Sequence, residues 1–206
     1  MNPVLPEHGF TEVDLVDLVR RLPQPAGDTP VFVAVNGPSS SGKTSLAARL
    51  AGALPRAAVV HTDDLAWHHA VLAWDDLLVD GVLTPVRAGH AVRFRPPAWD
   101  ARGRDGAVEV PAGLSHLLVE GVGVGRSALD DAFDVHLWVE TPRATRLARD
   151  AVRAAAGEMS PSAYAAWMAE EDAHFTADRP WERAAIIVDG TFGGTGERVR
   201  AAFPAG

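Results

Sequence analysis

The stretch VFVAVNGPSSSGKT, residues 31–44, decides the fold of this chain. It begins as an apolar run rich in valine, continues as a loop bounded by Gly37 and Gly42, and ends in Lys43-Thr44. The loop matches the pattern G-x-x-x-x-G-K-[ST] of a P-loop, which wraps the phosphates of a nucleotide when a strand precedes it and a helix follows. The flanking residues meet both requirements. The stretch therefore predicts a strand, a P-loop and a helix that together bind a nucleoside triphosphate.

Each residue type in this loop has a chemical reason. The two glycines let the backbone bend so that successive N–H groups turn toward an anion, and the helix that follows adds the positive end of its dipole. Lys43 supplies a mobile positive charge, and the Thr44 hydroxyl is a natural Mg²⁺ ligand. We therefore expect ATP and Mg²⁺ as cofactors. The residues expected to bind them here are Gly37, Ser39, Ser40, Ser41, Gly42, Lys43, Thr44 and Ser45.

The composition is that of an ordinary globular protein. The 206 residues, 47% hydrophobic and 22% charged, suit one α/β domain over residues 1–206, with an inserted or lid element. The net charge of −8 argues against nucleic acid as the main partner. The sequence contains no cysteine, which excludes disulfides and thiolate metal sites. We see neither a signal-peptide pattern nor an 18-residue apolar span, so we expect a cytoplasmic protein without membrane contact. A homodimer stays open.

Short apolar runs alternate with helical segments along the chain. This alternation predicts an α/β fold with a five-stranded parallel sheet flanked by helices. The expected strands are 31–36, 57–61, 116–120, 135–140 and 183–190, and the expected helices are 11–22, 45–54, 65–79, 142–156, 162–176 and 197–203. Residues 80–113 are expected to form a small, irregular insertion on the substrate side, with a hairpin between 91–95 and 107–110.

Acidic residues end or follow two of the expected strands. Asp63 and Asp64 come after the second strand, and Glu120 ends the third. Parallel sheets bind ligands beyond the carboxyl ends of their strands, so we expect these carboxylates to gather beside the P-loop. The candidate metal ligands are Thr44, Glu120 and Asp63. One carboxylate of the 63–64 pair is expected to act on the substrate, and the other to cap the next helix or reach the metal.

Arginines form two further groups. Arg146, Arg149 and Arg153 follow the spacing i, i+3, i+7, which places them on one face of the helix that begins near residue 142. We interpret residues 143–160 as a helical lid whose arginines bind triphosphate oxygens, with a solvated basic face as the alternative. Arg93 and Arg95 share one face of the expected hairpin, where they either grip an anionic or carbonyl-rich ligand or face solvent.

The order of these motifs resembles that of the uridine kinase and phosphoribulokinase-like branch of P-loop small-molecule kinases. The resemblance rests on the P-loop, on Thr62-Asp63-Asp64-Leu65, on Leu118-Val119-Glu120-Gly121 and on the segment 139–149. It implies that Asp63 is the general base that accepts the proton of the substrate hydroxyl, and that Glu120 lies near Mg²⁺. It also implies that the lid arginines reach the phosphates. The implied catalytic residues are Asp63, Lys43, Arg149 and Arg153.

The sequence departs from that family where the substrate binds. Uridine kinases carry a Phe-Tyr pair just after the base, whereas this chain has Leu65-Ala66-Trp67, and its segment 95–99 lacks the family's histidine. The resemblance implies transfer of the γ-phosphate of ATP to a hydroxyl of a small molecule, a nucleoside or a nucleoside-like compound. The candidate substrate-binding residues are Asp63, Asp64, Trp67, Arg93, Arg95 and Trp99. The alternatives are phosphorylation of an antibiotic or other natural product, a nucleoside monophosphate kinase, and a regulatory nucleotide-dependent switch.

Overall fold

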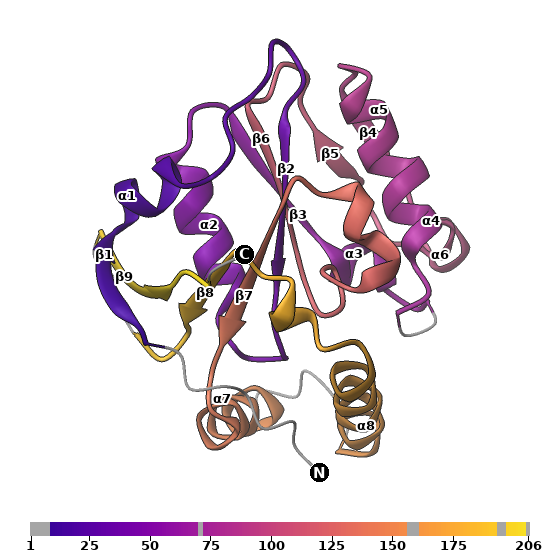
Figure 1. Ribbon diagram of the computed structural model, residues 1–206. Coiled ribbons are helices and arrows are strands. Elements are labelled where there is room, and N and C mark those ends of the chain that lie inside the picture. Colours follow the sequence, from indigo (N-terminus) through magenta and orange to yellow (C-terminus); the bar gives the residue numbers. More distant parts are fainter. Residues whose placement is uncertain (1–8, 70–71, 156–160, 193–196, 205–206) are drawn as a thin grey trace.

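A central sheet runs through the molecule (Figure 1). The computed structural model describes residues 9–69, 72–155, 161–192 and 197–204, and within them seven strands pair in the order β1-β9-β8-β7-β2-β6-β3. These strands are β1 (Thr11–Asp14), β2 (Val31–Asn36), β3 (Ala57–His61), β6 (His116–Glu120), β7 (Val135–Glu140), β8 (Ile186–Asp189) and β9 (Arg198–Ala202). The five strands β8, β7, β2, β6 and β3 run parallel, which confirms the predicted α/β class and its parallel sheet.

Two further strands extend one edge of the sheet, where the sequence analysis expected helices. β9 replaces the helix expected at 197–203, and β1 with the short helix α1 (Leu15–Arg20) replaces the single helix expected at 11–22. Both pairings, β1 with β9 and β9 with β8, are antiparallel. In β9 the buried Val199 and Ala201 alternate with the exposed Arg198 and Arg200, which is the period-2 pattern of a strand. The prediction was wrong because this pairing overrides a short helical pattern.

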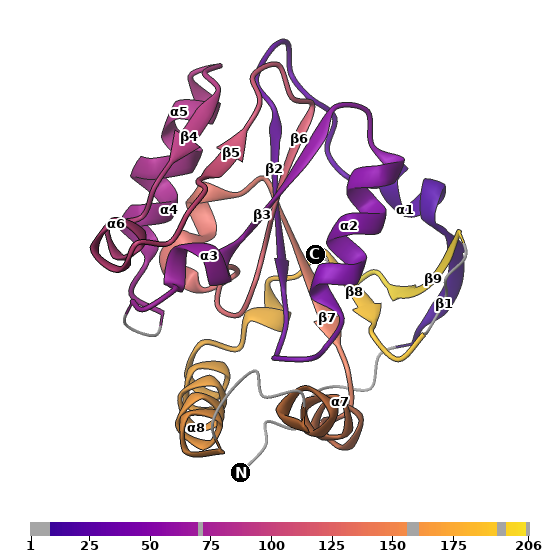
Figure 2. The same ribbon diagram turned by 180° about the vertical axis from the view of Figure 1, so that it is seen from behind.

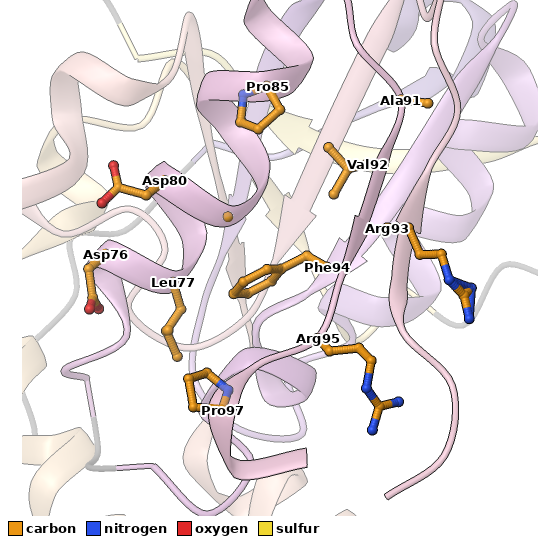
Figure 3. Close-up of a pocket in the computed structure, with 11 residues that line it drawn as sticks. Asp76, Leu77, Asp80, Pro85, Ala91, Val92, Arg93, Phe94, Arg95 and Pro97 are labelled. Atoms are coloured by element: carbon orange, nitrogen blue, oxygen red, sulfur yellow. The ribbon is translucent and has the colours of Figure 1, made fainter. Parts of the chain in front are cut away.

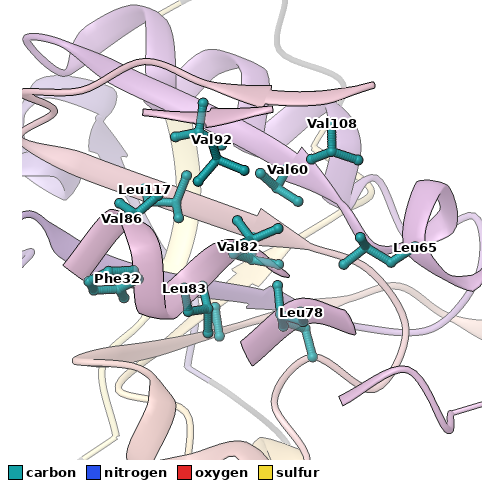
Figure 4. Close-up of a cluster of buried hydrophobic side chains, with 14 of the residues drawn as sticks. Phe32, Val60, Leu65, Leu78, Val82, Leu83, Val86, Val92, Val108 and Leu117 are labelled. Carbon is teal, nitrogen blue, oxygen red and sulfur yellow. The ribbon is translucent and has the colours of Figure 1, made fainter. Parts of the chain in front are cut away.

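The alternation of β2 divides the core into two halves. Phe32 and Ala34 pack in one buried cluster, and Val33 and Val35 pack in another. The second cluster includes apolar residues of α1 and of α2 (Lys43–Ala53), the helix predicted after the P-loop. Figure 4 shows the first cluster, which joins β2, β3 and β6 to helical residues between 65 and 86. The two clusters therefore pack on opposite faces of β2, the strand that leads into the P-loop.

The segment after β3 differs from the predicted helix 65–79. The chain forms α3 (Thr62–Ala66), then a continuous helical run made of α4 (Asp75–Leu78), a π-helical turn η1 (Val79–Leu83) and α5 (Thr84–Arg87). His68 and Leu72 both have positive φ angles, at +54° and +56°, which interrupts the helix between α3 and α4.

The insertion is more regular than expected. The predicted hairpin is present as β4 (Val92–Phe94) and β5 (Val108–Val110), paired antiparallel. Between its strands lies a helix that the sequence analysis did not foresee, α6 (Pro97–Arg102). Gly103 ends this helix at a φ of +65°, a conformation that glycine adopts without strain. The expectation of an irregular insertion was therefore wrong for these residues.

Two helices lie beyond the carboxyl ends of the strands, at the bottom of Figure 1 and, from behind, of Figure 2. They are α7 (Arg143–Ala155) and α8 (Pro161–Asp178), which match the helices expected from residue 142 and at 162–176. The break predicted at Gly157 lies outside the described residues. The short turns η2 (Ser127–Ala132) and η3 (Pro180–Glu182) complete the described structure. Among the helices of the described residues, none has the length and apolar character needed to cross a bilayer.

Candidate active site

The P-loop leaves β2 through a tight turn against β7. The Asn36 side chain at the strand end accepts hydrogen bonds from the N–H groups of Gly37, at 2.9 Å, and Gly123, at 3.1 Å. A Cβ atom on Gly37 would lie 2.6 Å from the carbonyl oxygen of Val139, so a larger residue would collide with the neighbouring strand. Gly42 has a φ of +103° at the start of α2. Both glycines of the motif are therefore required by the backbone path.

Lys43 points back into its own loop. Its ammonium group donates a hydrogen bond to the carbonyl of Pro38 at 2.9 Å, and the residue is only 8% exposed. Burial lowers the pKa of Lys43, while the charges of Glu120, Glu171 and Asp63 oppose that shift. The negative charges of these three carboxylates favour the protonated form of Lys43. A phosphate oxygen beside the ammonium group would favour the same form.

Thr44, Glu120 and His61 form one hydrogen-bonded group. The Thr44 hydroxyl donates to Glu120 Oε1 at 3.0 Å, and His61 Nδ1 lies 2.6 Å from the same oxygen. The register of β3 against β6 sets His61 opposite Glu120. Burial alone would raise the pKa of Glu120, but the hydrogen bonds of His61 and Thr44 and the charge of Lys43 outweigh it, so the pKa lies below its usual range. Glu120 is therefore held as an anion beside the P-loop threonine.

This group suits Mg²⁺, although the protein alone would not enclose the ion. Within the described part of the chain, no three His, Asp or Glu side chains come together as a metal site. Mg²⁺ commonly takes one or two protein oxygens and completes its six ligands with phosphate oxygens and water. The Thr44 hydroxyl and the Glu120 carboxylate supply such oxygens. The donor set therefore fits a magnesium ion that arrives with a nucleotide.

The two adjacent acids of α3 have different surroundings. Asp63 lines the P-loop cavity, and partial burial raises its pKa while the positive charge of Lys43 lowers it. Asp64 forms an ion pair with Arg104, and its backbone carbonyl accepts a hydrogen bond from Trp99 Nε1 at 2.8 Å. Neither acid is an N-cap, because α3 already begins at Thr62 and both lie in its first turn. The expected capping role was wrong for this reason.

Three of the four arginines of α7 are those expected to form the basic face. Arg149 donates to the carbonyls of Ser40, at 2.9 Å, and Gly190, at 2.8 Å. Arg153 Nη1 lies 3.5 Å from the Ser40 hydroxyl. Arg146 is buried and forms an ion pair with Glu171 of α8 at 3.2 Å. The alternative of a solvated basic face does not describe Arg146 and Arg149, whose guanidinium groups turn inward, whereas Arg153 is exposed.

α7 and α8 also hold the serines of the loop, which the sequence analysis did not foresee. The Ser40 hydroxyl donates to Asp150 of α7, whose carboxylate also accepts from the Tyr164 hydroxyl at 2.7 Å. Ser39 donates to Glu171 through its backbone N–H, at 2.7 Å, and through its hydroxyl, at 2.6 Å. The carboxylates come from helices more than a hundred residues away along the chain, so no local pattern indicates them.

One large cavity connects these groups. It has a volume of about 1260 Å³ and extends from α3 past the P-loop to the segment after β8. The predicted site residues that line it are Ser39, Ser40, Gly42, Lys43, Thr44, Ser45, Asp63, Trp67, Glu120, Arg149 and Arg153. Gly37, Ser41 and Arg146 do not line it but lie directly behind its wall, in contact with lining segments.

The remaining predicted residues do not line this cavity. Arg93 and Arg95 line a separate pocket of about 510 Å³ between the hairpin and α4–α5 (Figure 3). There Arg93 pairs with Glu109, and Arg95 pairs with Asp100 at 2.7 Å. Trp99 is 4% exposed and belongs to the core. The structure therefore does not bring these three residues together with the P-loop, because Arg93 and Arg95 line the separate pocket and Trp99 is buried in the core.

Two further acids lie at strand ends, in register with each other, and the sequence analysis did not single them out. Glu140 ends β7 opposite Asp189 of β8. Burial, with a smaller effect of the Asp189 charge, raises the pKa of Glu140 to about 7. Asp189 also lines the cavity and pairs with Arg200 at 3.0 Å. The carboxyl edge of the sheet therefore carries acids from four strands or the turns that follow them, which is the signal that could have identified this pair.

Comparison with solved structures places the fold. A protein described as a possible uridine kinase from Bacillus stearothermophilus aligns with a TM-score of 0.54 and 18% identity, covering 84% of this chain and 94% of its own. A candidate fructose transport system kinase from Silicibacter sp. TM1040 aligns with a TM-score of 0.54 and 22% identity, covering 82% and 91%. No protein-family model and no curated protein sequence matches this chain. The chain has the fold of the uridine kinase and phosphoribulokinase-like P-loop kinases.

Proposed function

We propose that this protein is a phosphotransferase that moves the γ-phosphate of ATP to a hydroxyl group of a small molecule. One observation carries the proposal. A single cavity is lined by the P-loop lysine, by the hydrogen-bonded pair of Thr44 and Glu120, by Asp63 and by two arginines of α7, Arg149 and Arg153. These are the groups that phosphoryl transfer requires, because the protein contributes mostly positioning and charge stabilisation to this reaction. They come from four separate segments of the chain, so their convergence is a property of the fold.

The phosphate end of the cavity has three kinds of donor. The P-loop N–H groups and Lys43 would bind the β- and γ-phosphates, and Thr44 and Glu120 would hold Mg²⁺. When bound, Mg²⁺ neutralises phosphate charge that builds up during transfer. Arg149 and Arg153 reach the same end from α7. These cations would stabilise the charge that develops on the transferred group.

Asp63 would be the general base. Its carboxylate lines the cavity close enough to Lys43 for the two charges to shift each other's pKa. It would accept the proton that the acceptor hydroxyl loses as that oxygen bonds to the γ-phosphorus, while the bond from the γ-phosphorus to the oxygen of the β-phosphate breaks and ADP leaves. A raised pKa makes a carboxylate a stronger base, as general base catalysis favours. Asp64 is less suited to this role because its carboxylate is engaged by Arg104.

We propose a nucleoside or a nucleoside-like compound as the acceptor. Trp67 lines the cavity one turn after Asp63 and offers an indole surface for a planar ring. The two arginines that would suit an anionic acceptor, Arg93 and Arg95, lie in the other pocket. This arrangement favours a neutral acceptor over a nucleoside monophosphate. An antibiotic or another natural product with a ring beside its hydroxyl is the second candidate, since Trp67 does not distinguish between these rings.

Acceptor-dependent formation of ADP tests the proposal. Nucleosides, sugars, vitamins and antibiotics are screened one by one with Mg-ATP, and each hit is confirmed by the mass of the phosphorylated product. Arg93→Ala serves as the matched control for Arg149→Ala, because it removes an arginine from the other pocket. We expect one class of acceptor to raise ADP formation well above the level without acceptor. Slow ADP formation that no acceptor stimulates would instead indicate a nucleotide-dependent switch.

A further inference from the structure

Glu171 of α8 is a carboxylate buried against the phosphate-binding loop. It is only 1% exposed, and the proposed phosphotransfer assigns it no role. One of its oxygens accepts two hydrogen bonds from Ser39, from the backbone N–H at 2.7 Å and from the hydroxyl at 2.6 Å. Its other oxygen faces Arg146 at 3.2 Å. Three donors therefore converge on one buried carboxylate.

The surroundings reinforce this contact from both helices. Trp167, one turn before Glu171 on α8, donates its indole N–H to the Ser39 hydroxyl at 2.7 Å. Arg146 of α7 is also buried, at 7% exposure, so its ion pair with Glu171 is shielded from water. Glu171 is also close enough to Lys43 to raise the pKa of that ammonium group. A negative charge of the protein therefore lies within the site that is built for negative phosphates.

Glu171 and a bound phosphate compete for the same partners. The Ser39 N–H can donate one good hydrogen bond, to the carboxylate or to a phosphate oxygen. The negative charge of Glu171 also offsets part of the positive charge of Arg146 and Lys43, so these two groups attract a phosphate less strongly. Two like charges a few ångströms apart also repel each other, and they do so more strongly in a partly buried site than in water. Both effects act against the nucleotide.

We propose that Glu171 is an internal competitor for phosphate that lowers the affinity of the site for its nucleotide. This inference rests on the proposed function, because it takes the P-loop cavity as a nucleotide site. It assigns Arg146 two alternative anionic partners, the Glu171 carboxylate and a phosphate oxygen. The carboxylate stabilises the nucleotide-free chain and weakens nucleotide binding, so that product ADP leaves more readily.

Binding of Mg-ADP by calorimetry tests the proposal with Glu171→Gln and its matched control Glu170→Gln. Both variants remove one negative charge from α8, but Glu170 is exposed. We expect Glu171→Gln to bind Mg-ADP roughly tenfold more tightly than the wild type, which corresponds to about 1.4 kcal/mol. Glu170→Gln should bind like the wild type. Without nucleotide, Glu171→Gln should melt at a lower temperature, because Arg146 loses its buried partner.

The outcomes separate the inference from the proposed function. Affinity of Glu171→Gln equal to or weaker than that of the wild type would overturn the inference and leave the kinase proposal intact. A wild-type chain that binds no Mg-ADP would overturn both. If Glu171→Gln does not fold, Glu171→Asp replaces it, since aspartate keeps the charge but is one methylene shorter and reaches Ser39 less well. That variant should bind Mg-ADP about two- to threefold more tightly, and unchanged or weaker binding overturns the inference.

Discussion

The P-loop cavity and the pocket beside the hairpin contain the same kinds of charged residue and differ in how these residues are held. In the smaller pocket, Arg93 and Arg95 lie on a hairpin and pair with Glu109 and Asp100, whose side chains are mostly exposed. In the larger cavity, arginines of α7 turn inward onto the P-loop, and Glu120 lies at the end of a fully buried strand. Exposed ion pairs contribute little free energy and are screened by salt. The charged groups beside the P-loop are therefore held in position by buried elements, whereas those of the hairpin pocket are not.

The P-loop also differs from the hairpin pocket in the type of its cationic side chain, which is a lysine and not an arginine. Lys43 is the only lysine in the sequence, and all other cationic side chains apart from histidine are arginines. An ammonium group is a compact point charge on a flexible stem, whereas a guanidinium group is a rigid, planar fork. The compact ammonium group of Lys43 reaches the Pro38 carbonyl of its own loop at 2.9 Å. The comparison of the two pockets therefore predicts that substitutions have large effects around Lys43 and small effects on the hairpin.

The largest effect is expected for Lys43→Ala. Removing the buried ammonium group should abolish acceptor-dependent ADP formation while the chain stays folded, because Lys43 contacts its own loop and not the apolar core. Thermal unfolding with and without Mg-ATP provides the control. The nucleotide should stabilise the wild type and should stabilise the variant much less. Full turnover by the folded variant would contradict the central role of the P-loop.

The next largest effect separates Asp63 from Asp64. Asp63→Asn should lower turnover by about a hundredfold or more, the usual scale for a positioned general base, and should leave Mg-ATP binding intact. Asp64→Asn should keep turnover within a few fold and weaken its ion pair with Arg104, a loss of about 1 kcal/mol or less. Turnover and melting temperature are measured for both with one identified acceptor. If Asp64→Asn is the inactive variant, the two roles are reversed.

A smaller effect compares the pockets directly, through one arginine from each. Arg149→Ala should slow transfer by about tenfold, more than it weakens ATP binding, since contacts of this kind tighten in the transition state. Arg93→Ala should change neither, because its guanidinium group is paired with Glu109 outside the cavity. Steady-state kcat and the dissociation constant for ATP distinguish the two. Equal behaviour of both variants would remove the distinction between the pockets.

The smallest effect is a pH dependence of stability. The hydrogen bond to Glu120, partly offset by burial, raises the pKa of His61 above its ordinary value of 6.5. The protonated histidine therefore contributes stability that is fully present below pH 6.5 and is lost as the pH rises through its folded pKa. Because His61 is partly exposed, the change in melting temperature between pH 6 and pH 8 should stay below about 2–4 °C. His61→Gln should flatten this part of the curve, and an unchanged curve would contradict the coupling.

Local sequence determined the parts of this protein whose signals are short. The valine-rich run and the glycine loop specify β2, the P-loop and α2, because phosphate binding at a helix start needs those residue types at that spacing. The apolar runs specify the five parallel strands, since strands buried on both faces are apolar throughout. The order of the predicted parallel strands was sufficient to predict that Asp63 and Glu120 lie at the carboxyl edge of the sheet. Their register with neighbouring strands follows from parallel pairing.

Tertiary structure decided the rest, because the deciding partners are distant in the sequence. Strand β1 forms because it pairs with β9, which lies near the other end of the sequence. Glu171 reaches Ser39 only when α8 packs over the loop, 132 residues further on. His61 joins Thr44 and Glu120 because β3 lies beside β6, and Arg93 stays outside the P-loop cavity because its hairpin lines a separate pocket. Periodicity and motifs report local preference, whereas these contacts depend on which surfaces the folded chain buries together.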